Sequence, residues 1–188
     1  GLKITSDTSG ALDIQSAGTT KIAMDSSGNV SLAGNLAVTG SMPTGSIMQV
    51  IQGRTKAVVT TTSSTSFVDI GLSATITPSS TSSKILVICN VAGIMIDATS
   101  GAFARLILLR GSTNVTGDAA APYLAYPHLY LGTAASRSAP SSINYLDSPA
   151  STSALTYKIQ NANSGGGTIN FQRDSQVYST MMLMEVAG

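Results

Sequence analysis

The strongest constraint on this chain is a six-residue repeat between Gly28 and Met42, where the sequence reads GNVSLAGNLAVTGSM. Glycines recur at positions 28, 34 and 40, and each is followed by a small polar residue and then by an apolar one. Apolar residues two positions apart share one face of a strand, and Gly-Asn supplies the positive φ of a tight turn. The repeat therefore predicts short strands and turns in tandem, each with one narrow apolar stripe.

A repeat of this size cannot bury its stripe alone, because stacked repeats share a core with their neighbours. The chain contains few repeats, so we expect the neighbours to be other copies of the same chain in an intertwined, fibrous oligomer. Only 10% of the residues are charged, whereas soluble domains usually contain about 25%. Since the net charge is only +1, a lone monomer would tend to associate.

The composition also limits the partners. The basic residues are scattered, which argues against nucleic-acid binding, because that function needs clustered cations. The longest apolar stretch, residues 85–96, is too short to span a bilayer and the start of the sequence lacks the apolar segment of a signal peptide. We therefore do not expect membrane insertion. The single cysteine, Cys89, cannot form an internal disulfide and is expected to be a buried, inert thiol.

A Pro/Gly junction at residues 43–46 divides the chain where thin apolar stripes give way to thicker apolar runs. Residues 1–42 form a repetitive β shaft in this interpretation, with alternating pairs such as Leu12/Ile14 and Ile22/Met24. Residues 47–188 contain many short strand patterns separated by turn signals, which predicts a β-sandwich tip domain of jelly-roll type. The fold class is thus all-β.

The strands expected in the tip domain are residues 47–51, 57–62, 67–77 (a pair broken near Gly71), 84–91, 103–109, 154–160 and 180–186. Gly165, Gly166 and Gly167 are expected to form a flexible turn. Strands 84–91 and 180–186 are apolar on both faces, so we expect the core to cover one face and sister subunits the other.

Three motifs carry a resemblance to a known family. Asp25-Ser-Ser-Gly-Asn-Val followed by Gly-Asn-Leu-Ala-Val-Thr-Gly resembles the repeats of bacteriophage tail fibres. Pro43-Thr-Gly-Ser-Ile-Met-Gln-Val-Ile-Gln resembles the passage from fibre shaft to tip, and Ser73-Ala-Thr-Ile-Thr-Pro-Ser-Ser-Thr-Ser-Ser-Lys-Ile-Leu-Val resembles a motif of fibre tip domains. The resemblance implies a parallel homotrimer at the distal end of a tail fibre on the virion, where it binds a host cell-surface glycan or outer-membrane receptor.

An aromatic cluster is the candidate receptor-binding site. Tyr123, Tyr126, His128 and Tyr130 lie within eight residues of one another in a chain with only 5% aromatic residues. Tyrosine offers a flat apolar face and a polar tip, which suits sugar rings and wet interfaces. The same tyrosines could instead pack between subunits. If their replacement leaves both assembly and host binding unchanged, the loop expected at residues 136–142 is the next candidate.

Catalytic chemistry is not expected. His128 is the only histidine, and no Gly-x-Ser-x-Gly motif accompanies it. No spacing marks a pair of acidic residues for glycan cleavage. Three copies of His128 around a threefold axis could hold a metal ion, but its flanks are typical of a surface or packed residue, so neither a metal nor a cofactor is predicted. The sequence favours a structural and receptor-binding fibre tip over two alternatives, a trimeric carbohydrate-binding module of another surface or secreted protein and a glycan depolymerase.

Overall fold

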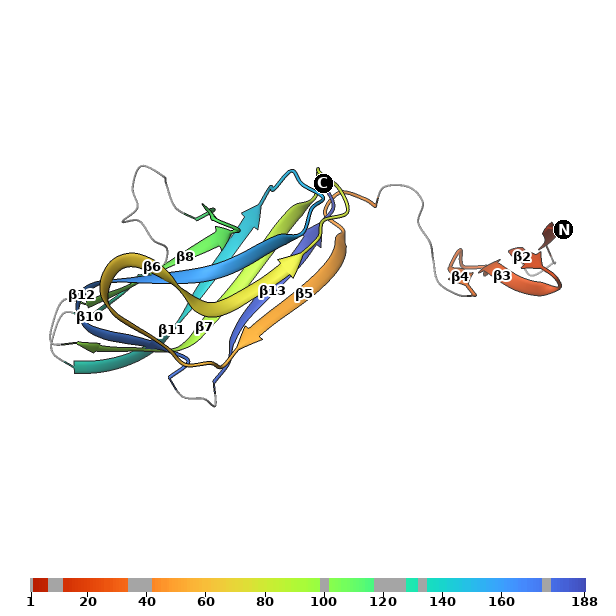
Figure 1. Ribbon diagram of the computed structural model, residues 1–188. Coiled ribbons are helices and arrows are strands. Elements are labelled where there is room, and N and C mark those ends of the chain that lie inside the picture. Colours follow the sequence, from red (N-terminus) through yellow and green to blue (C-terminus); the bar gives the residue numbers. More distant parts are fainter. Residues whose placement is uncertain are drawn as a thin grey trace. The chain divides into compact units, whose positions relative to one another are not determined.

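The computed structural model describes residues 2–6, 12–33, 42–98, 102–116, 128–131, 135–173 and 177–188. These residues form strands and turns and include no helix, so the all-β prediction is confirmed. The chain divides into two compact units, Gly1–Met42 and Pro43–Gly188 (Figure 1).

The first unit is an antiparallel sheet whose strands follow chain order: β1 (Leu2–Ser6), β2 (Leu12–Ser16), β3 (Thr19–Met24) and β4 (Val30–Leu32). A tight turn at Ala17 and Gly18, both with positive φ, joins β2 to β3. The next turn is held by Asp25, whose Oδ1 accepts the backbone N–H groups of Ser27 and Asn29, each at 2.9 Å. The turn expected at this motif is therefore present. The repeat beyond it, residues 34–41, lies outside the described residues.

One face of this sheet carries an apolar stripe. Cross-strand pairing places six apolar side chains in two rows, Leu12–Met24–Val30 and Ile14–Ile22–Leu32. Residues directly opposite one another in an antiparallel pair point to the same face. The β3 and β4 members are exposed, and Val30 is 55% exposed. The described part of this unit is a single layer, so none of its described strands covers this apolar face.

The second unit contains one nine-stranded antiparallel sheet among the residues described. Its strands are β5 (Ile47–Thr55), β6 (Val59–Ile76), β7 (Lys84–Ala98), β8 (Ala102–Arg110), β9 (Thr113–Asn114), β10 (His128–Leu131), β11 (Ala135–Asp147), β12 (Leu155–Phe171) and β13 (Ser179–Val186).

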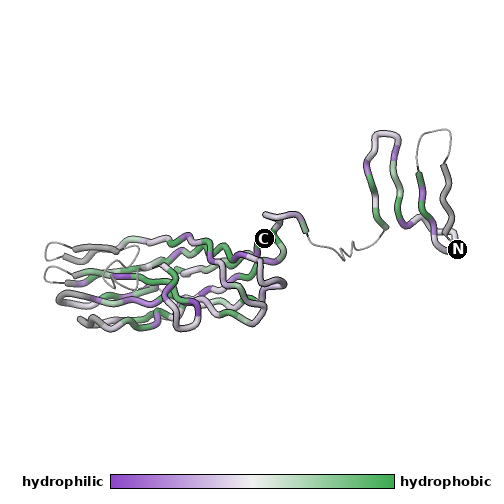
Figure 2. Tube along the Cα trace, turned by 90° about the horizontal axis from the view of Figure 1, so that it is seen from above, coloured by the Kyte–Doolittle hydropathy of each residue, from purple (hydrophilic) through white to green (hydrophobic). Residues whose placement is uncertain are grey.

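This sheet folds over into two layers (Figure 1). Strands β5, β13, β7 and β11 are neighbours in one layer, and β6, β12 and β8 are neighbours in the other. The layers are continuous because the end of β12 pairs with the end of β7, through Ile169 and Ile96. Apolar side chains from both layers form a single core, which includes Ile70, Leu72, Val87, Leu106, Tyr157 and Leu183. This arrangement is compatible with the expected β-sandwich, and Figure 2 shows hydrophobic segments running along the strands.

Close backbone contacts set the approach of β5 to β6 and join the two ends of the second unit. An added Cβ at Gly53 of β5 would lie 2.1 Å from the backbone oxygen of Ser73 of β6, so only glycine allows this approach. At the junction, the N–H of Gly45 donates to the carbonyl of Ala187, and the N–H of Ala187 donates to the carbonyl of Ser46, both at 2.8 Å. The start of β5 and the end of β13 are therefore joined beyond the last pair of the ladder.

Three sequence-based expectations for the strands are wrong. The pair of strands expected at residues 67–77 is part of a single strand, β6, in which Gly71 adopts a φ of +77° without ending the strand. Residues 165–167 lie inside β12 instead of forming a turn, because ladders with β6 and β7 continue beyond them. Residues 136–142 belong to β11 and are not a loop, because they pair with β7.

Candidate functional site

The structure describes only part of the predicted aromatic cluster. Tyr123 and Tyr126 lie outside the described residues. His128 and Tyr130 lie in β10, which pairs with the start of β8, His128 opposite Arg105 and Tyr130 opposite Phe103. The prolines and Gly132 that bound this cluster predict a loop, but His128 and Tyr130 belong to a strand at the edge of the described sheet.

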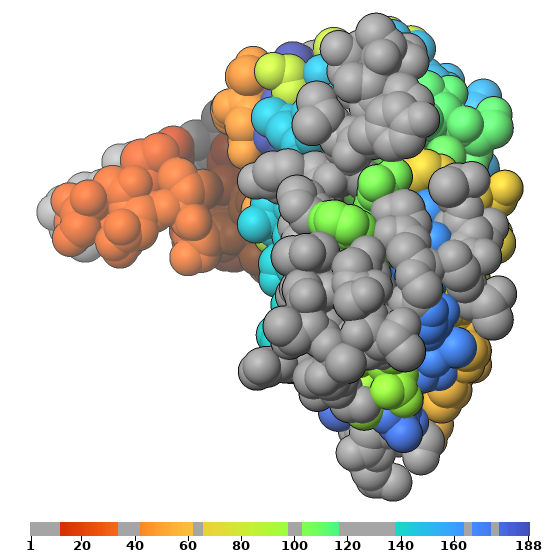
Figure 3. All heavy atoms as spheres, turned by 90° about the vertical axis from the view of Figure 1, so that its left-hand side faces the viewer, coloured from red at the N-terminus to blue at the C-terminus, as the bar shows by residue number. Residues whose placement is uncertain are grey.

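Strand β10 lies at the end of the unit where β7 passes to β8. The start of β8 pairs with β10, and the end of β7 pairs with the start of β11. Figure 3 views the molecule from this side, where parts of β8 (green) and β11 (cyan) reach the surface. The candidate residues of β10 and the first residues of β11 therefore share one end of the domain.

A β-bulge interrupts β7 near this end. Up to Val91 the odd-numbered residues of β7 are buried, and from Ile94 onward the even-numbered residues are. The change occurs at Ala92 and Gly93, which together oppose the single residue Pro140 of β11. Gly93 has a φ of +61°, and proline, which lacks an N–H, is tolerated at such an irregularity.

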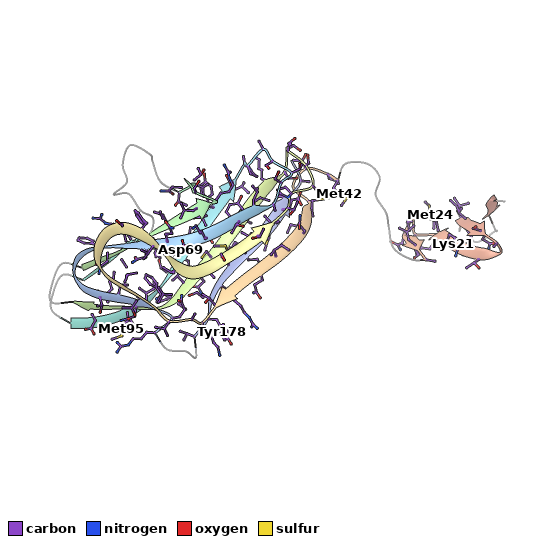
Figure 4. The ribbon with its side chains drawn as sticks, viewed as in Figure 1. Lys21, Met24, Met42, Asp69, Met95 and Tyr178 are labelled. Carbon is purple, nitrogen blue, oxygen red and sulfur yellow. The ribbon has the colours of Figure 1, made fainter. Side chains whose placement is uncertain are left out.

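A groove of about 580 Å³ opens beside this bulge. Its described lining comes from β7, β11 and the segment between β12 and β13: Gly93, Met95, Ser138, Ala139, Pro140, Arg173 and Val177. Met95 lies toward the end of the domain that is away from the end of β13 (Figure 4). We call this feature the bulge groove. Sequence patterns did not reveal it, because its residues come from three separated segments and form no local motif.

Hydrogen bonds to β7 and to buried side chains hold the segment of the bulge groove that carries Arg173. The backbone N–H groups of Gln172 and Arg173 donate to the carbonyls of Ala92 and Gly93, both at 3.3 Å. The fully buried Gln172 side chain donates from Nε2 to Ser179 Oγ at 2.6 Å, and that oxygen also accepts the Ala92 N–H at 3.0 Å. These hydrogen bonds therefore fix the backbone position from which the Arg173 side chain extends.

The outward face of the layer formed by β5, β13, β7 and β11 changes character along its length. At the C-terminal end of β13 one cross-strand row is apolar, Val50–Met184–Leu86–Leu146. The next row contains Met182 and Ile88 between two polar residues, and the third row is polar, Arg54–Thr180–Asn90–Ser142. We call the apolar end, residues Val50, Leu86, Ile88, Leu146, Met182 and Met184, the outer apolar face. The bulge groove lies at the opposite end of this layer.

Glu185 is fully buried and is satisfied by four donors. Gln49 Nε2 donates to its Oε2 at 2.6 Å, and Oε1 accepts the backbone N–H of Ser79 at 2.7 Å and the hydroxyls of Ser79 and Ser83 at 2.6 and 2.7 Å. Burial raises the pKa of Glu185, but the hydrogen bonds from Gln49, Ser79 and Ser83 outweigh it and lower the pKa to about 2. The Ser-rich segment before β7 is thus fastened to the last strand.

A second buried polar group joins Asp147, Tyr157 and Arg110. Asp147 Oδ2 accepts the Tyr157 hydroxyl at 2.6 Å and the Arg110 guanidinium at 2.5 Å. Burial and the hydrogen bond to Asp147 raise the pKa of the Tyr157 hydroxyl. The hydrogen bonds and the ion pair join these groups to one another across the fold, which gives them a structural role.

Metal ligation and thiol chemistry are not supported within the described ranges. No group of three or more His, Cys, Asp or Glu side chains in them could hold a metal ion. Cys89 is buried, and burial raises the pKa of its thiol to about 12, so the expected inert thiol is confirmed. Among the same residues, no helix is long and apolar enough to cross a bilayer.

Comparisons with known proteins give structural likenesses of low degree. No protein-family model matches the chain, and no curated protein matches it significantly. A chain in a structure of the Gt strain of infectious bursal disease virus aligns with 95% of this chain at 12% identity and a TM-score of 0.40, and the alignment spans only 43% of that viral chain. A chain from Bacillus endospore appendages, disulfide-linked pili, aligns over its whole length with 82% of this chain at 13% identity and a TM-score of 0.32. Likenesses of this degree do not indicate a function.

Proposed function

We propose that this chain is the end of a bacteriophage tail fibre, in which a β-repeat shaft and a jelly-roll-like tip form a parallel homotrimer that binds a host cell-surface glycan. The observation that carries the proposal is shared by both units. Each has a sheet with apolar side chains that stay exposed or half-buried among the described residues of that unit. The motifs that resemble fibre repeats support this class of assembly, and the exposed apolar faces supply a physical reason for it.

The first unit supports self-association most directly. Its stripe of six apolar side chains lies on one face of a single-layered sheet. Burying apolar surface stabilises by about 25 cal/mol per Å², and a small sheet without a second layer has little stability of its own. Sister copies of the same stripe would supply the missing layer.

The second unit supports it through strands β7 and β13. In β13 the residues alternate between buried and half-buried, and the half-buried ones include Met182 and Met184 on the outer apolar face. On the same face Leu146 is 49% exposed and Val50 is 51% exposed. A contiguous apolar patch on a chain with few charges is typical of an interface. Two further copies of the chain would cover both the outer apolar face of the second unit and the apolar stripe of the first.

Receptor binding is assigned to the opposite end of the tip. Strand β10 and the start of β11 lie there, at the other end of the layer from the outer apolar face. A trimer that associates through the outer apolar face would leave this end free and present it three times. Weak single contacts would then be strengthened by effective concentration, by a factor on the order of 10² or more.

Assembly can be tested by sedimentation velocity at micromolar concentration, for which we expect a trimer. Leu146→Glu places a charge in the outer apolar face and should shift the protein toward monomer. Val68→Glu is the matched control, because Val68 is 42% exposed on β6 in the other layer. A monodisperse wild-type monomer would refute the homotrimer.

Receptor binding can be tested by adsorption of the trimer to host cells before and after enzymatic removal of surface glycans. Tyr126→Ala and Tyr130→Ala should leave the trimer intact and weaken adsorption, whereas Val68→Ala should leave adsorption unchanged. Mutants that fail to assemble would identify the tyrosines as interface residues. Release of reducing sugar ends from purified host polysaccharide would instead support the depolymerase alternative.

A further inference from the structure

The bulge groove is a built feature of the fold. Strand β7 pairs with β13 as far as Asn90 and with β12 from Met95 onward. Between these points the bulge at Ala92 and Gly93 turns the strand from one partner to the other, and the groove opens where the two ladders separate. Bulges are often found where a strand must aim a side chain or end a pairing.

Glycine is required at the floor of the groove. A Cβ at Gly93 would lie 2.8 Å from Val177 Cγ2 and 3.1 Å from Gln172 Cα, and the φ of +61° disfavours other residues. The segments that carry Arg173 and Val177 therefore pack directly on the bulge. A site with a fixed backbone loses little entropy when a ligand binds.

The described lining residues offer three kinds of contact. Arg173 is exposed and is the only charged residue among them, and Ser138 contributes an exposed hydroxyl. Met95, Pro140 and Val177 contribute apolar surface. A guanidinium, a hydroxyl and an apolar wall together match a ring that has an anionic group, hydroxyl groups and a C–H face.

The Arg173 guanidinium is available for an anion. Its Nη1 contacts Met95 Sδ, and a thioether is a weak acceptor that leaves the positive charge uncompensated. Neither of the ion pairs Arg110–Asp147 and Lys158–Asp69 involves Arg173. Arginine binds carboxylate and phosphate groups with two parallel hydrogen bonds.

We infer that the bulge groove binds an acidic sugar, with Arg173 on its carboxylate or phosphate, Ser138 on a hydroxyl, and Met95 and Pro140 against the ring. The volume of about 580 Å³ falls within the range of ~300–1,000 Å³ that is usual for small-molecule sites. This inference rests on the proposed function, because it names the chemical class of glycan that a fibre tip would recognise. It places this contact in a groove whose described lining contains no tyrosine.

The test follows the methionine methyl signals of the full-length protein, labelled with ¹³C-methyl methionine, by NMR. Methyl glucuronide and glucose 6-phosphate should shift the Met95 signal, and the Met184 signal should stay in place. Methyl glucoside, which lacks the anionic group, should bind roughly tenfold more weakly, as expected for the loss of one charge-assisted pair. Arg173→Gln should abolish the preference for the acidic sugars.

Lys84→Gln is the matched control, because it removes the same charge from an exposed position at the start of β7, at the other end of the layer. It should retain the preference. Equal binding of the glucoside and both acidic sugars, or no Met95 shift with any of them, would overturn the inference. Inorganic phosphate binding as tightly as glucose 6-phosphate would also overturn it, because the groove would then recognise an anion and not a sugar.

The outcomes separate this inference from the proposed function. If the protein binds acidic sugars but remains monomeric and does not adsorb to cells, the result would support sugar binding in the bulge groove and refute the fibre tip. If the trimer adsorbs to cells but none of the three sugars shifts its Met95 signal, the result would support the fibre tip and refute sugar binding in the bulge groove.

Discussion

Glu185 is an ionised side chain in a fully buried position, and its stabilising effect depends on pH. Its pKa is lowered from the ordinary 4.5 to about 2 by the hydrogen bonds from Gln49, Ser79 and Ser83. A lowered pKa in the folded state means that stability is present above the unfolded pKa and is lost as the pH falls toward 2. A lowering of the pKa by this amount corresponds to at most roughly 3.5 kcal/mol.

We therefore expect Glu185→Gln to lower the free energy of unfolding at pH 6. The difference from the wild type should narrow between about pH 4.5 and pH 2, as urea denaturation at each pH would measure. A difference independent of pH would show that the side chain acts through its shape and not its charge.

Gly53 and Gly71 of the second unit are required for different reasons, a close backbone contact and a positive φ. At Gly53 an added Cβ would meet the backbone oxygen of Ser73, so Gly53→Ala must push two strands apart. At Gly71 there is room for a Cβ but φ is +77°, so Gly71→Ala should cost only about 1–2 kcal/mol of backbone strain. Thermal unfolding should show the larger loss for Gly53→Ala, and Gly71→Asn should recover part of the Gly71→Ala loss.

Individual residues were predictable where local chemistry decides their role. Cys89 was expected to be buried because it sits in an apolar run, and it is. The role of Glu185 was not predictable, because its four donors come from Gln49 and from the Ser79–Ser83 segment, which lie 136 and at least 102 residues away in the sequence. No sequence pattern marked Arg173 as a site residue, because the residues beside it in the groove come from distant parts of the sequence.

At the scale of elements, the turn between β3 and β4 depends on one side chain. Asp25 accepts the backbone N–H groups of Ser27 and Asn29, and its Oδ2 accepts the Asn29 side-chain amide. Asp25→Ala should therefore loosen β4 and speed hydrogen exchange of the Ala33 N–H, which donates to Lys21 at 2.9 Å. Exchange in β7 and β13 of the second unit serves as the internal control and should not change.

Strands were predictable where alternation is regular and were misjudged where glycine and serine interrupt it. The strand expected at residues 180–186 corresponds to β13, but residues 165–167 and 136–142 were expected to turn or loop and instead extend β12 and β11. Local propensity favours turns in such segments. Pairing with long neighbouring strands overrides that propensity, and the length of β6 and β7 cannot be seen from the segments themselves.

At the scale of the whole molecule, the two units differ in what they need from partners. Residues 43–188 enclose their own core, so we expect them to unfold cooperatively when expressed alone, with a midpoint within a few degrees of the full chain. Residues 1–42 form a single described layer with an exposed stripe, so we expect them to lack stable structure as an isolated monomer. Circular dichroism of the two fragments checks both expectations, and a stably folded monomeric fragment 1–42 would contradict the need for sister copies.

The pairing of β5 with β13 has a mechanical consequence. Strand β5 is the first strand of the second unit, and its ladder with β13 runs from Ile47 opposite Val186 to Thr55 opposite Ser179. Hydrogen bonds of an antiparallel pair stand perpendicular to the strands. A pull on the junction along β5, against an opposing force at the groove end of the domain, would load these bonds together in shear instead of peeling them one at a time. The ladder would then separate only under a tension large enough to break its hydrogen bonds together, a resistance that the proposed fibre tip would need.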